Sequence, residues 1–333
     1  MTTVIEALRS GLADEMVIDR RVFVMGEDIR IGGSFHLTLG LLERFGSERI
    51  IDTPVSEAGF VGLAIGAAIA GDRPVVDFQY GDFLLCAADQ VIQQAAKLPF
   101  MSGGSLSVPM VLHAPTGASG RGAQHANSIE NFFHGVPGLT VGVPATPYDA
   151  KGMMVAALRH DGPVLICSHK HLYGSKGRQV QSAVSAQDVP PDQYTIPIGQ
   201  AIVRRPGKDV TIVSALLMMH RALQAAEVLR SEGIDVEVID LRWLNPIDAP
   251  MVIRSVEKTG HLVVVEEGPA LGGWGGSVAS AVAEHAFGSL RAPIRHLAGP
   301  ESPIPFAPHL EAALIPSVER IAATTRLLVK EGT

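Results

Sequence analysis

The sequence has little cysteine, no excess of positive charge and no apolar run long enough to cross a membrane. Only Cys86 and Cys167 occur among 333 residues, which excludes a disulfide scaffold and favours a reducing compartment, with both thiols in the core. The net charge of −7 argues against nucleic acid as the main partner, because phosphate binding needs a basic face. The most apolar stretch, residues 59–71, is shorter than a membrane span.

Several catalytic signatures are also missing from the chain. The N-terminus has no basic segment followed by an apolar run, which predicts a cytoplasmic, soluble protein without a membrane partner. There is no GxSxG, HExxH, Walker loop or cysteine–histidine cluster, which argues against a serine hydrolase, a P-loop enzyme and a metal site. The glycines of 272–276 do not match GxGxxG, and a turn that admits close backbone contact explains them more simply.

Short apolar runs alternate with helical patterns along the whole chain. Residues 22–26 are apolar, and residues 108–113 are apolar up to the final His113, whereas 3–19 and 82–98 have the pattern or length of helices. Apolar strands that alternate with helices predict parallel sheets covered on both faces, an α/β fold. The glycine-rich segment 59–71 is apolar all round, which predicts a buried helix.

One segment interrupts this alternation. Residues 176–200 have no periodicity and contain Pro190-Pro191, which is typical of a linker. The sequence therefore predicts two α/β domains, at 1–175 and 201–333.

Glu57 stands at the start of the apolar helix, directly after Ser56, which is predicted to cap the helix. The carboxyl can simply complement the helix dipole, or it can be a functional acid whose pKa is raised by dry surroundings. Small residues recur at every fourth position: Ala58, Gly62, Gly66 and Ala70. We expect this stripe to pack closely against another helix at a subunit interface.

A second candidate is the glycine-rich loop 113–127, which contains His125. Parallel α/β proteins place ligands on loops at the carboxyl ends of their strands. A mobile surface loop with an incidental histidine explains the pattern equally well.

A set of motifs occurs in a fixed order along the chain. They are Gly26-Glu27-Asp28, Asp52-Thr53-Pro54-Val55-Ser56-Glu57, Asp82-Phe83, Asp89-Gln90, Gly122-Ala123-Gln124-His125, Pro137-Gly138-Leu139, Pro147-Tyr148-Asp149-Ala150-Lys151-Gly152, Leu172-Tyr173-Gly174-Ser175-Lys176-Gly177 and Val238-Ile239-Asp240-Leu241-Arg242. Together they resemble the β subunit of the thiamine diphosphate-dependent first component of 2-oxo acid dehydrogenase complexes. The pyruvate and acetoin types are the most similar.

This resemblance implies a transketolase-like fold, with a pyrimidine-binding domain followed by a transketolase C-terminal domain. It implies thiamine diphosphate shared with a separate α subunit, which also holds Mg²⁺, in a heterotetramer of two α and two β chains. The absence of a Gly-Asp-Gly segment followed by asparagine, which would bind the diphosphate and its metal, agrees with this division. The substrate would be a small 2-oxo acid or acetoin, and the acyl unit would pass to lipoamide on an acyltransferase core.

The resemblance also assigns roles to single residues. Glu57 matches the glutamate that hydrogen-bonds the aminopyrimidine ring nitrogen, and Phe83 matches an aromatic residue that packs on this ring. His125 matches a histidine on the substrate side, a candidate for proton handling. Neighbours that line the same pocket are Val55 and Gln79. Asp52 is expected to support the turn rather than to act in catalysis.

Two departures from the family pattern leave the acceptor open. Ala126-Asn127 replaces a usual Ser-Gln, and Ser168-His169 replaces a usual Glu-His. A two-chain transketolase-like acyl or ketol transferase is therefore a second hypothesis. A non-catalytic, β-like scaffold is a third, which the presence of Glu57, Phe83 and His125 disfavours.

Overall fold

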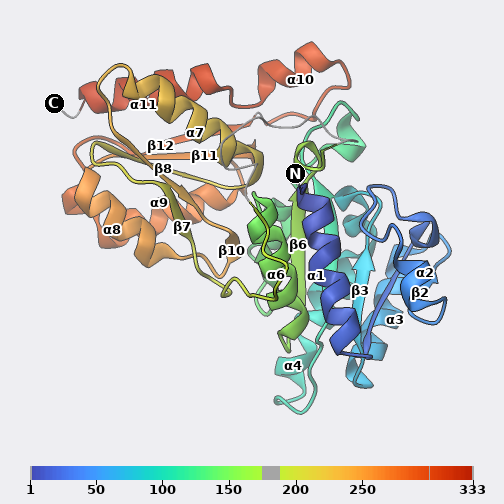
Figure 1. Cartoon of the computed structure of the whole chain (residues 1–333). Helices are drawn as coiled ribbons and strands as arrows, with labels where there is room; N and C mark the ends of the chain where they lie inside the picture. Colours follow the sequence, from blue (N-terminus) through green and yellow to red (C-terminus); the bar gives the residue numbers. More distant parts are fainter. Residues whose placement is uncertain (1, 175–187, 300, 332–333) are drawn as a thin grey trace.

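The structure is a computed structural model that describes residues 2–174, 188–299 and 301–331. The chain forms two sheets with helices packed around them (Figure 1). Residues 176–187 of the predicted linker lie outside the described residues. The remainder of the linker runs over α6 (Pro147–Arg159), where Ile196 donates its backbone N–H to Gly152 and the ring of Tyr194 stacks on Tyr148.

The first sheet has seven strands in the order β10-β5-β6-β4-β3-β1-β2. The strands are β1 (Val22–Gly26), β2 (Ile50–Asp52), β3 (Arg73–Asp77), β4 (Val111–Thr116), β5 (Thr140–Gly142), β6 (Val164–His169) and β10 (Trp243–Asn245). All neighbours are parallel except β10 and β5. The continuous apolar runs of the central strands correspond to burial on both faces, as β4 and β6 show along their whole length.

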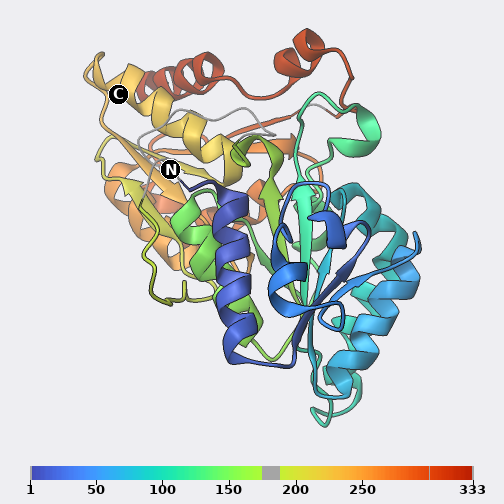
Figure 2. The same cartoon turned by 45° about the vertical axis from the view of Figure 1, so that its right-hand side comes forward.

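The helices of this half are α1 (Val4–Ile18), α2 (Leu41–Phe45), α3 (Glu57–Ile69), α4 (Leu98–Met101), α5 (Glu130–Phe133) and α6. Helix α1 begins with a capping box, in which Thr3 and Glu6 satisfy each other's backbone N–H groups. It lies beside α6 over one face of the sheet, and Figure 2 shows the pair from a second side.

The second sheet has five strands in the order β12-β11-β8-β9-β7. They are β7 (Ile202–Arg205), β8 (Val210–Ser214), β9 (Val236–Asp240), β11 (Leu262–Pro269) and β12 (Arg295–Gly299), and only β7 pairs in the antiparallel sense. The helices around it are α7 (Leu216–Arg230), α8 (Ala249–Thr259), α9 (Trp274–His285), α10 (Pro308–Leu314) and α11 (Val318–Glu331). The prediction of an α/β fold with two mostly parallel sheets is confirmed.

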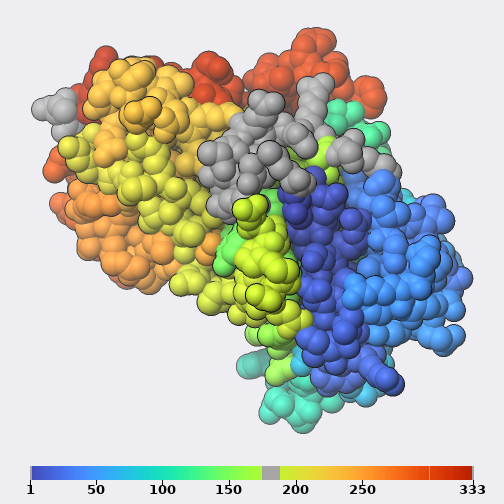
Figure 3. Space-filling model, viewed as in Figure 1, coloured from blue at the N-terminus to red at the C-terminus, as the bar shows by residue number. Residues whose placement is uncertain are grey.

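Strand β10 ties the two halves together, since it comes from the second half of the sequence and completes the first sheet. Trp243 is fully buried there, and a side chain on Gly142 would meet its ring at 2.8 Å. A buried ion cluster lies beside this strand: Arg204 pairs with Asp149 and Asp240, and Arg242 approaches Asp149 to 2.7 Å. The halves form one continuous body in the space-filling view (Figure 3).

Three expectations from the sequence are wrong for this chain. Helix α3 is not buried all round, because Leu63 is 60% exposed and the stripe residues Ala58, Gly66 and Ala70 face outward. Cys86 is exposed rather than part of the core, while Cys167 is buried as predicted.

The segment 82–98, predicted as one long helix, is helical over most of its length but is not a single α-helix. It is a 3₁₀ segment, η2 (Gly81–Ala87), followed by a π-helical segment, η3 (Gln90–Ala95). Gly81 is packed so tightly that a Cβ would lie 2.9 Å from the carbonyl oxygen of Pro115, and short 3₁₀ and π segments of this kind often mark functional positions.

In the described part of the chain, no helix is long and apolar enough to cross a membrane.

Candidate functional site

Three predicted site residues, together with Glu27, which the sequence reasoning did not select, follow the carboxyl ends of four neighbouring parallel strands. Glu27 follows β1, Glu57 follows β2, Phe83 follows β3, and His125 lies in the loop after β4. Because parallel strands end at the same edge of a sheet, four separate loops converge there. The sheet therefore gathers residues that are almost 100 positions apart in the sequence.

His125 and Phe83 are brought into direct contact. Their ring centroids lie 5.5 Å apart, and a third ring, Tyr80, lies 4.5 Å from His125 and 5.8 Å from Phe83. The ammonium of Lys170 stands over the face of Tyr80, 5.6 Å from the ring centroid. Tyr80 is a site residue that the sequence reasoning missed, although its position between Gln79 and Phe83 could have indicated it.

An acidic side of the site is formed by Glu57 and Glu27. Glu57 is the first residue of α3 and is half-buried, and the hydroxyl of Ser56 makes no cap hydrogen bond within the described chain. Glu27 is only 8% exposed, and its Oε1 has no hydrogen-bond partner among the described residues. Burial raises the pKa of Glu27, and the nearby carboxylates of Glu57 and Asp28 raise it further.

The remaining predicted residues lie on this acidic side. The side-chain amide of Gln79 donates to Asp28 at 2.9 Å, while Val55 is 79% exposed. Asp52 accepts a hydrogen bond from the backbone N–H of Arg30 at 2.9 Å, a contact that joins the end of β2 to the segment after β1. Helix α3, which begins at Glu57, contacts η2, which carries Phe83, so the acidic side and the aromatic cluster adjoin along one sheet edge.

Asn127 connects the His125 loop to η2. Its side-chain amide donates to Asp82 and to the carbonyl of Ala123. Asn127 and Asp82 line an open pocket of about 470 Å³ beside His125 and Phe83. Asn127, one of the residues that differ from the family pattern, therefore has a structural role: its side-chain amide holds the loop against the segment that carries Phe83.

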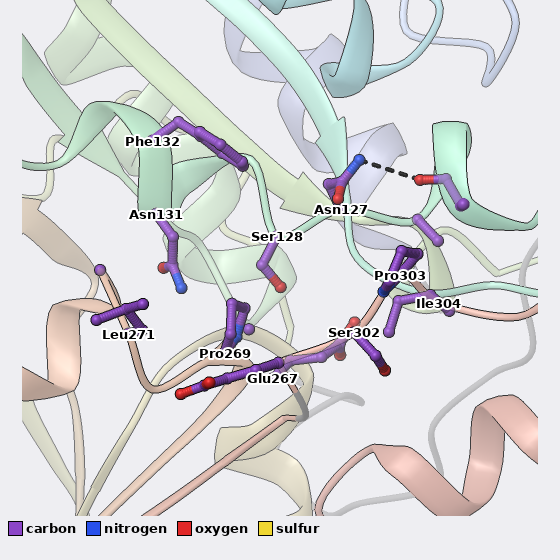
Figure 4. A pocket seen from close by; sticks show the side chains of 15 residues that line it. Asn127, Ser128, Asn131, Phe132, Glu267, Pro269, Leu271, Ser302, Pro303 and Ile304 are labelled. Atoms are coloured by element: carbon purple, nitrogen blue, oxygen red, sulfur yellow. Dashed lines mark hydrogen bonds between the residues drawn. The ribbon is translucent and has the colours of Figure 1, made fainter.

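A second pocket, of about 580 Å³, lies between the two halves of the chain. Figure 4 shows its wall, with Asn127, Ser128 and Phe132 from the first half facing Glu267, Pro269 and Leu271 from the second. Ala123 and Asn127 line both pockets. The two pockets therefore share a wall next to His125.

The second half of the chain also holds the His125 loop. Glu267 accepts hydrogen bonds from the backbone N–H of Ala118 at 2.6 Å and from His169 at 2.8 Å, and Glu311 accepts one from Gly120 at 2.8 Å. Burial alone would raise the pKa of Glu267. The charge and hydrogen bond of His169, the hydrogen bond from the backbone N–H of Ala118 and the charge of Arg221 together outweigh it and lower the pKa to about 2.

Ser168 and His169, the second place where the chain differs from the family pattern, each belong to a buried hydrogen-bond network next to the site. His113 lies between Asp77 and Ser168, at 2.7 Å from each, and Ser168 also contacts the hydroxyl of Tyr173. His169 turns the other way, toward Glu267. These partners lie 55 and 98 positions away in the sequence, so sequence spacing could not have revealed them.

Across the described residues, no group of three or more histidine, cysteine, aspartate or glutamate side chains could hold a metal ion.

Comparison with known proteins agrees with this architecture. Residues 1–176 match the transketolase pyrimidine binding domain, and residues 199–321 match the transketolase C-terminal domain. A solved structure described as a split-gene transketolase, inactive beta4 tetramer, superimposes with a TM-score of 0.80 at 23% identity, over 100% of this chain and 99% of that one. The protein is therefore a two-domain α/β protein of the transketolase-like class.

Sequence relatives place the chain more closely. The acetoin:2,6-dichlorophenolindophenol oxidoreductase subunit beta of Cupriavidus necator is 42% identical, over 98% of this chain and 97% of that protein. The pyruvate dehydrogenase E1 component subunit beta of Rickettsia felis is 45% identical (95% and 94%), and the 2-oxoisovalerate dehydrogenase subunit beta of Bacillus subtilis is 41% identical (98% and 98%). The chain belongs to the family of β subunits of thiamine diphosphate-dependent 2-oxo acid dehydrogenases, which are oxidoreductase components.

Proposed function

We propose that this chain supplies the aminopyrimidine side of a thiamine diphosphate site that it completes with an α subunit, and that the complex oxidises a small 2-oxo acid or acetoin. The observation that carries this proposal is the convergence of Glu57, Phe83 and His125 at one sheet edge, while the chain has no diphosphate-binding motif. The α subunit would hold the diphosphate and Mg²⁺, in a complex of two α and two β chains. A cytoplasmic location remains a prediction.

The side chains at this edge fit an aminopyrimidine ring. Phe83 offers an apolar face beside an open pocket, and Glu57 offers a carboxyl that can share a proton with a ring nitrogen. The unsatisfied Oε1 of Glu27 has unused hydrogen-bonding capacity on the same side, and the raised pKa of Glu27 keeps this group protonated to a higher pH than an ordinary carboxyl. Val55 and Gln79 would border the ring.

When bound, thiamine diphosphate supplies the carbon nucleophile that the carbonyl carbon of a 2-oxo acid requires. This chain would contribute a proton-holding carboxyl at Glu57, a ring contact at Phe83 and an imidazole at His125. The imidazole can donate or accept a proton near neutral pH. The partly exposed state of Glu57 in the single chain agrees with a site that the α subunit closes and dries.

The experiment is reconstitution of the β chain with its α subunit. Glu57→Gln keeps the shape of the side chain but removes the shared proton, and we expect turnover to fall by a hundredfold or more, on the order of the effect of general acid–base groups. Glu48→Gln, on an exposed loop, is the matched control and should retain activity. Near-full turnover by the Glu57 variant would refute the assigned role.

The acyl acceptor needs a separate experiment. We propose a lipoyl group on an acyltransferase core as the acceptor. The alternative, a carbonyl acceptor and therefore an acyl or ketol transferase, rests on Asn127, whose side chain differs from the family pattern and lines both pockets. Reductive acylation of an isolated lipoyl domain supports the dehydrogenase, whereas activity with a carbonyl acceptor alone selects the transferase.

A further inference from the structure

Thr116, the last residue of β4, has a hydroxyl at the base of the His125 loop. Its Oγ1 accepts a hydrogen bond from the backbone N–H of Ile129 at 3.1 Å. The same atom lies 3.1 Å from the carbonyl oxygen of Asn127 and 2.6 Å from Oε2 of Glu130. All four groups are buried or largely buried. One side chain of the sheet therefore contacts both ends of the segment that follows the loop.

The number of hydrogens decides the state of this cluster. A threonine hydroxyl carries one hydrogen, and the carbonyl oxygen of Asn127 can only accept. If the hydroxyl donates to Asn127, the 2.6 Å contact to Glu130 requires a hydrogen on the carboxyl, because two oxygens without a hydrogen between them repel. A protonated Glu130 satisfies every contact at once, with Thr116 accepting from Ile129 and Glu130 and donating to Asn127.

We propose that Glu130 acts as a protonated positioning residue, whose carboxyl hydrogen bond to Thr116 holds the His125 loop in place. Glu130 begins α5 and is 4% exposed. Among the described residues, it forms no ion pair with lysine or arginine within 4.0 Å.

The groups that face Glu130 come from several elements. Glu266 and Glu267 lie on β11 and share a small cavity with Glu130 and His169. Cys167 lies on β6, and the ammonium of Lys170 follows that strand with no hydrogen-bond partner in the described chain. Burial is the largest influence on the pKa of Glu130 and raises it. Hydrogen bonds from Thr116 and from the backbone lower the pKa, the charges of Glu267 and Glu266 raise it, and the pKa lies at about 7.

Loss of this proton would change the support of the loop. An ionised Glu130 attracts the single hydrogen of Thr116, so the carbonyl of Asn127 keeps only its bond from the backbone N–H of Gly117, at 3.0 Å. Asn127 in turn holds Asp82 through its side chain. The contact is thus complete below the pKa of about 7 and weakens above it, and the effect reaches both His125 and the segment that carries Phe83.

The first test detects the proton directly and needs no catalytic activity. The reconstituted αβ complex is titrated by infrared difference spectroscopy, and we expect the C=O stretch of a buried neutral carboxyl that disappears as the pH rises through about 7. Glu130→Gln removes this band, whereas the exposed control Glu284→Gln leaves it. A spectrum without the band, or a band that remains in Glu130→Gln, overturns the proposal even if the chain has the proposed function.

The second test rests on the proposed role of His125 in turnover. Glutamine can donate from Nε2 to Thr116 but cannot ionise. We expect kcat of the unsubstituted complex to decline above pH 7, whereas Glu130→Gln should keep activity below pH 7 and lose this decline. Glu130→Met removes the hydrogen bond and should lower kcat about tenfold at every pH, the loss expected from one positioning contact. An unchanged pH profile in Glu130→Gln contradicts the positioning role, and it does so without affecting the outcome of Glu57→Gln.

Discussion

The imidazole of His125 stands edge-on against the ring of Tyr80, with the centroids 4.5 Å apart and the planes at 82°. Tyr80 is itself held by Phe35, at 5.3 Å between centroids, and by Phe83 on the next turn of chain. Edge-to-face contacts of this kind stabilise a ring in one orientation. The position of the imidazole is therefore set by a residue of the β3 end as well as by its own loop.

Replacement of Tyr80 should separate positioning from folding. Tyr80→Leu removes the ring that orients His125, and aromatic pairs contribute about 0.5–1.5 kcal/mol, so we expect kcat to fall by up to about tenfold. Tyr80→Phe keeps the ring and should retain kcat. Steady-state kinetics of the reconstituted complex provide the measurement, with circular dichroism to verify the fold. Equal losses in both variants would show that the hydroxyl, and not the ring, is responsible.

The ion pair between Glu267 and His169 predicts how stability changes with pH. The folded chain lowers the pKa of Glu267 from 4.5 to about 2. The stabilisation is thus fully present above pH 4.5 and is lost as the pH falls from 4.5 to 2. Glu267→Gln should lower the free energy of unfolding by roughly 3 kcal/mol near neutral pH, since each unit of pKa shift corresponds to about 1.4 kcal/mol.

Denaturant unfolding of the chain at several pH values checks this prediction. The curves of the Glu267 variant and the unsubstituted chain should approach each other below pH 4.5. Asp72→Asn, on an exposed turn, is the control and should follow the unsubstituted chain throughout. A difference between the two proteins that stays constant down to pH 2 would mean that the pair contributes packing and not charge.

The regular alternation of strands and helices made the α/β fold predictable from the sequence, because buried parallel strands are apolar on both faces. Sequence motifs were sufficient to select Glu57, Phe83 and His125 as candidate site residues. Tyr80, Thr116 and Glu130 were not selected, since their importance lies in contacts between loops of different strands. Strand β10 was also missed, because three residues that pair with a distant strand carry no periodic pattern.

Helix α3 shows a further limit of sequence reasoning. Its apolar composition predicts burial, yet Leu63 is 60% and Ile69 is 39% exposed in the chain by itself. These apolar side chains would be buried only if another chain covers the helix. The pattern thus predicts the environment of the helix in an assembly, and the single chain lacks that environment.

Gly66 offers a test of this assembly. A Cβ at this position would meet no heavy atom within 4 Å in the chain, so Gly66→Leu should leave the fold and stability of the β chain intact. If the small-residue stripe packs against a helix of another subunit, the added side chain will hold the two backbones apart. We therefore expect at least a tenfold weaker association with the α subunit or with a second β chain, the loss that corresponds to about 1.4 kcal/mol.

Gly276 on α9 is the matched control, because it is also an exposed helical glycine with no heavy atom within 4 Å of a built Cβ. Gly276→Leu should assemble normally in analytical ultracentrifugation of the mixed subunits. If both variants assemble with equal affinity, the stripe on α3 is not a contact surface, and the exposed apolar residues of this helix need another partner. If only Gly66→Leu fails while its melting temperature as a single chain is unchanged, the helix that carries Glu57 lies at the subunit interface, so that assembly and the completion of the site occur together.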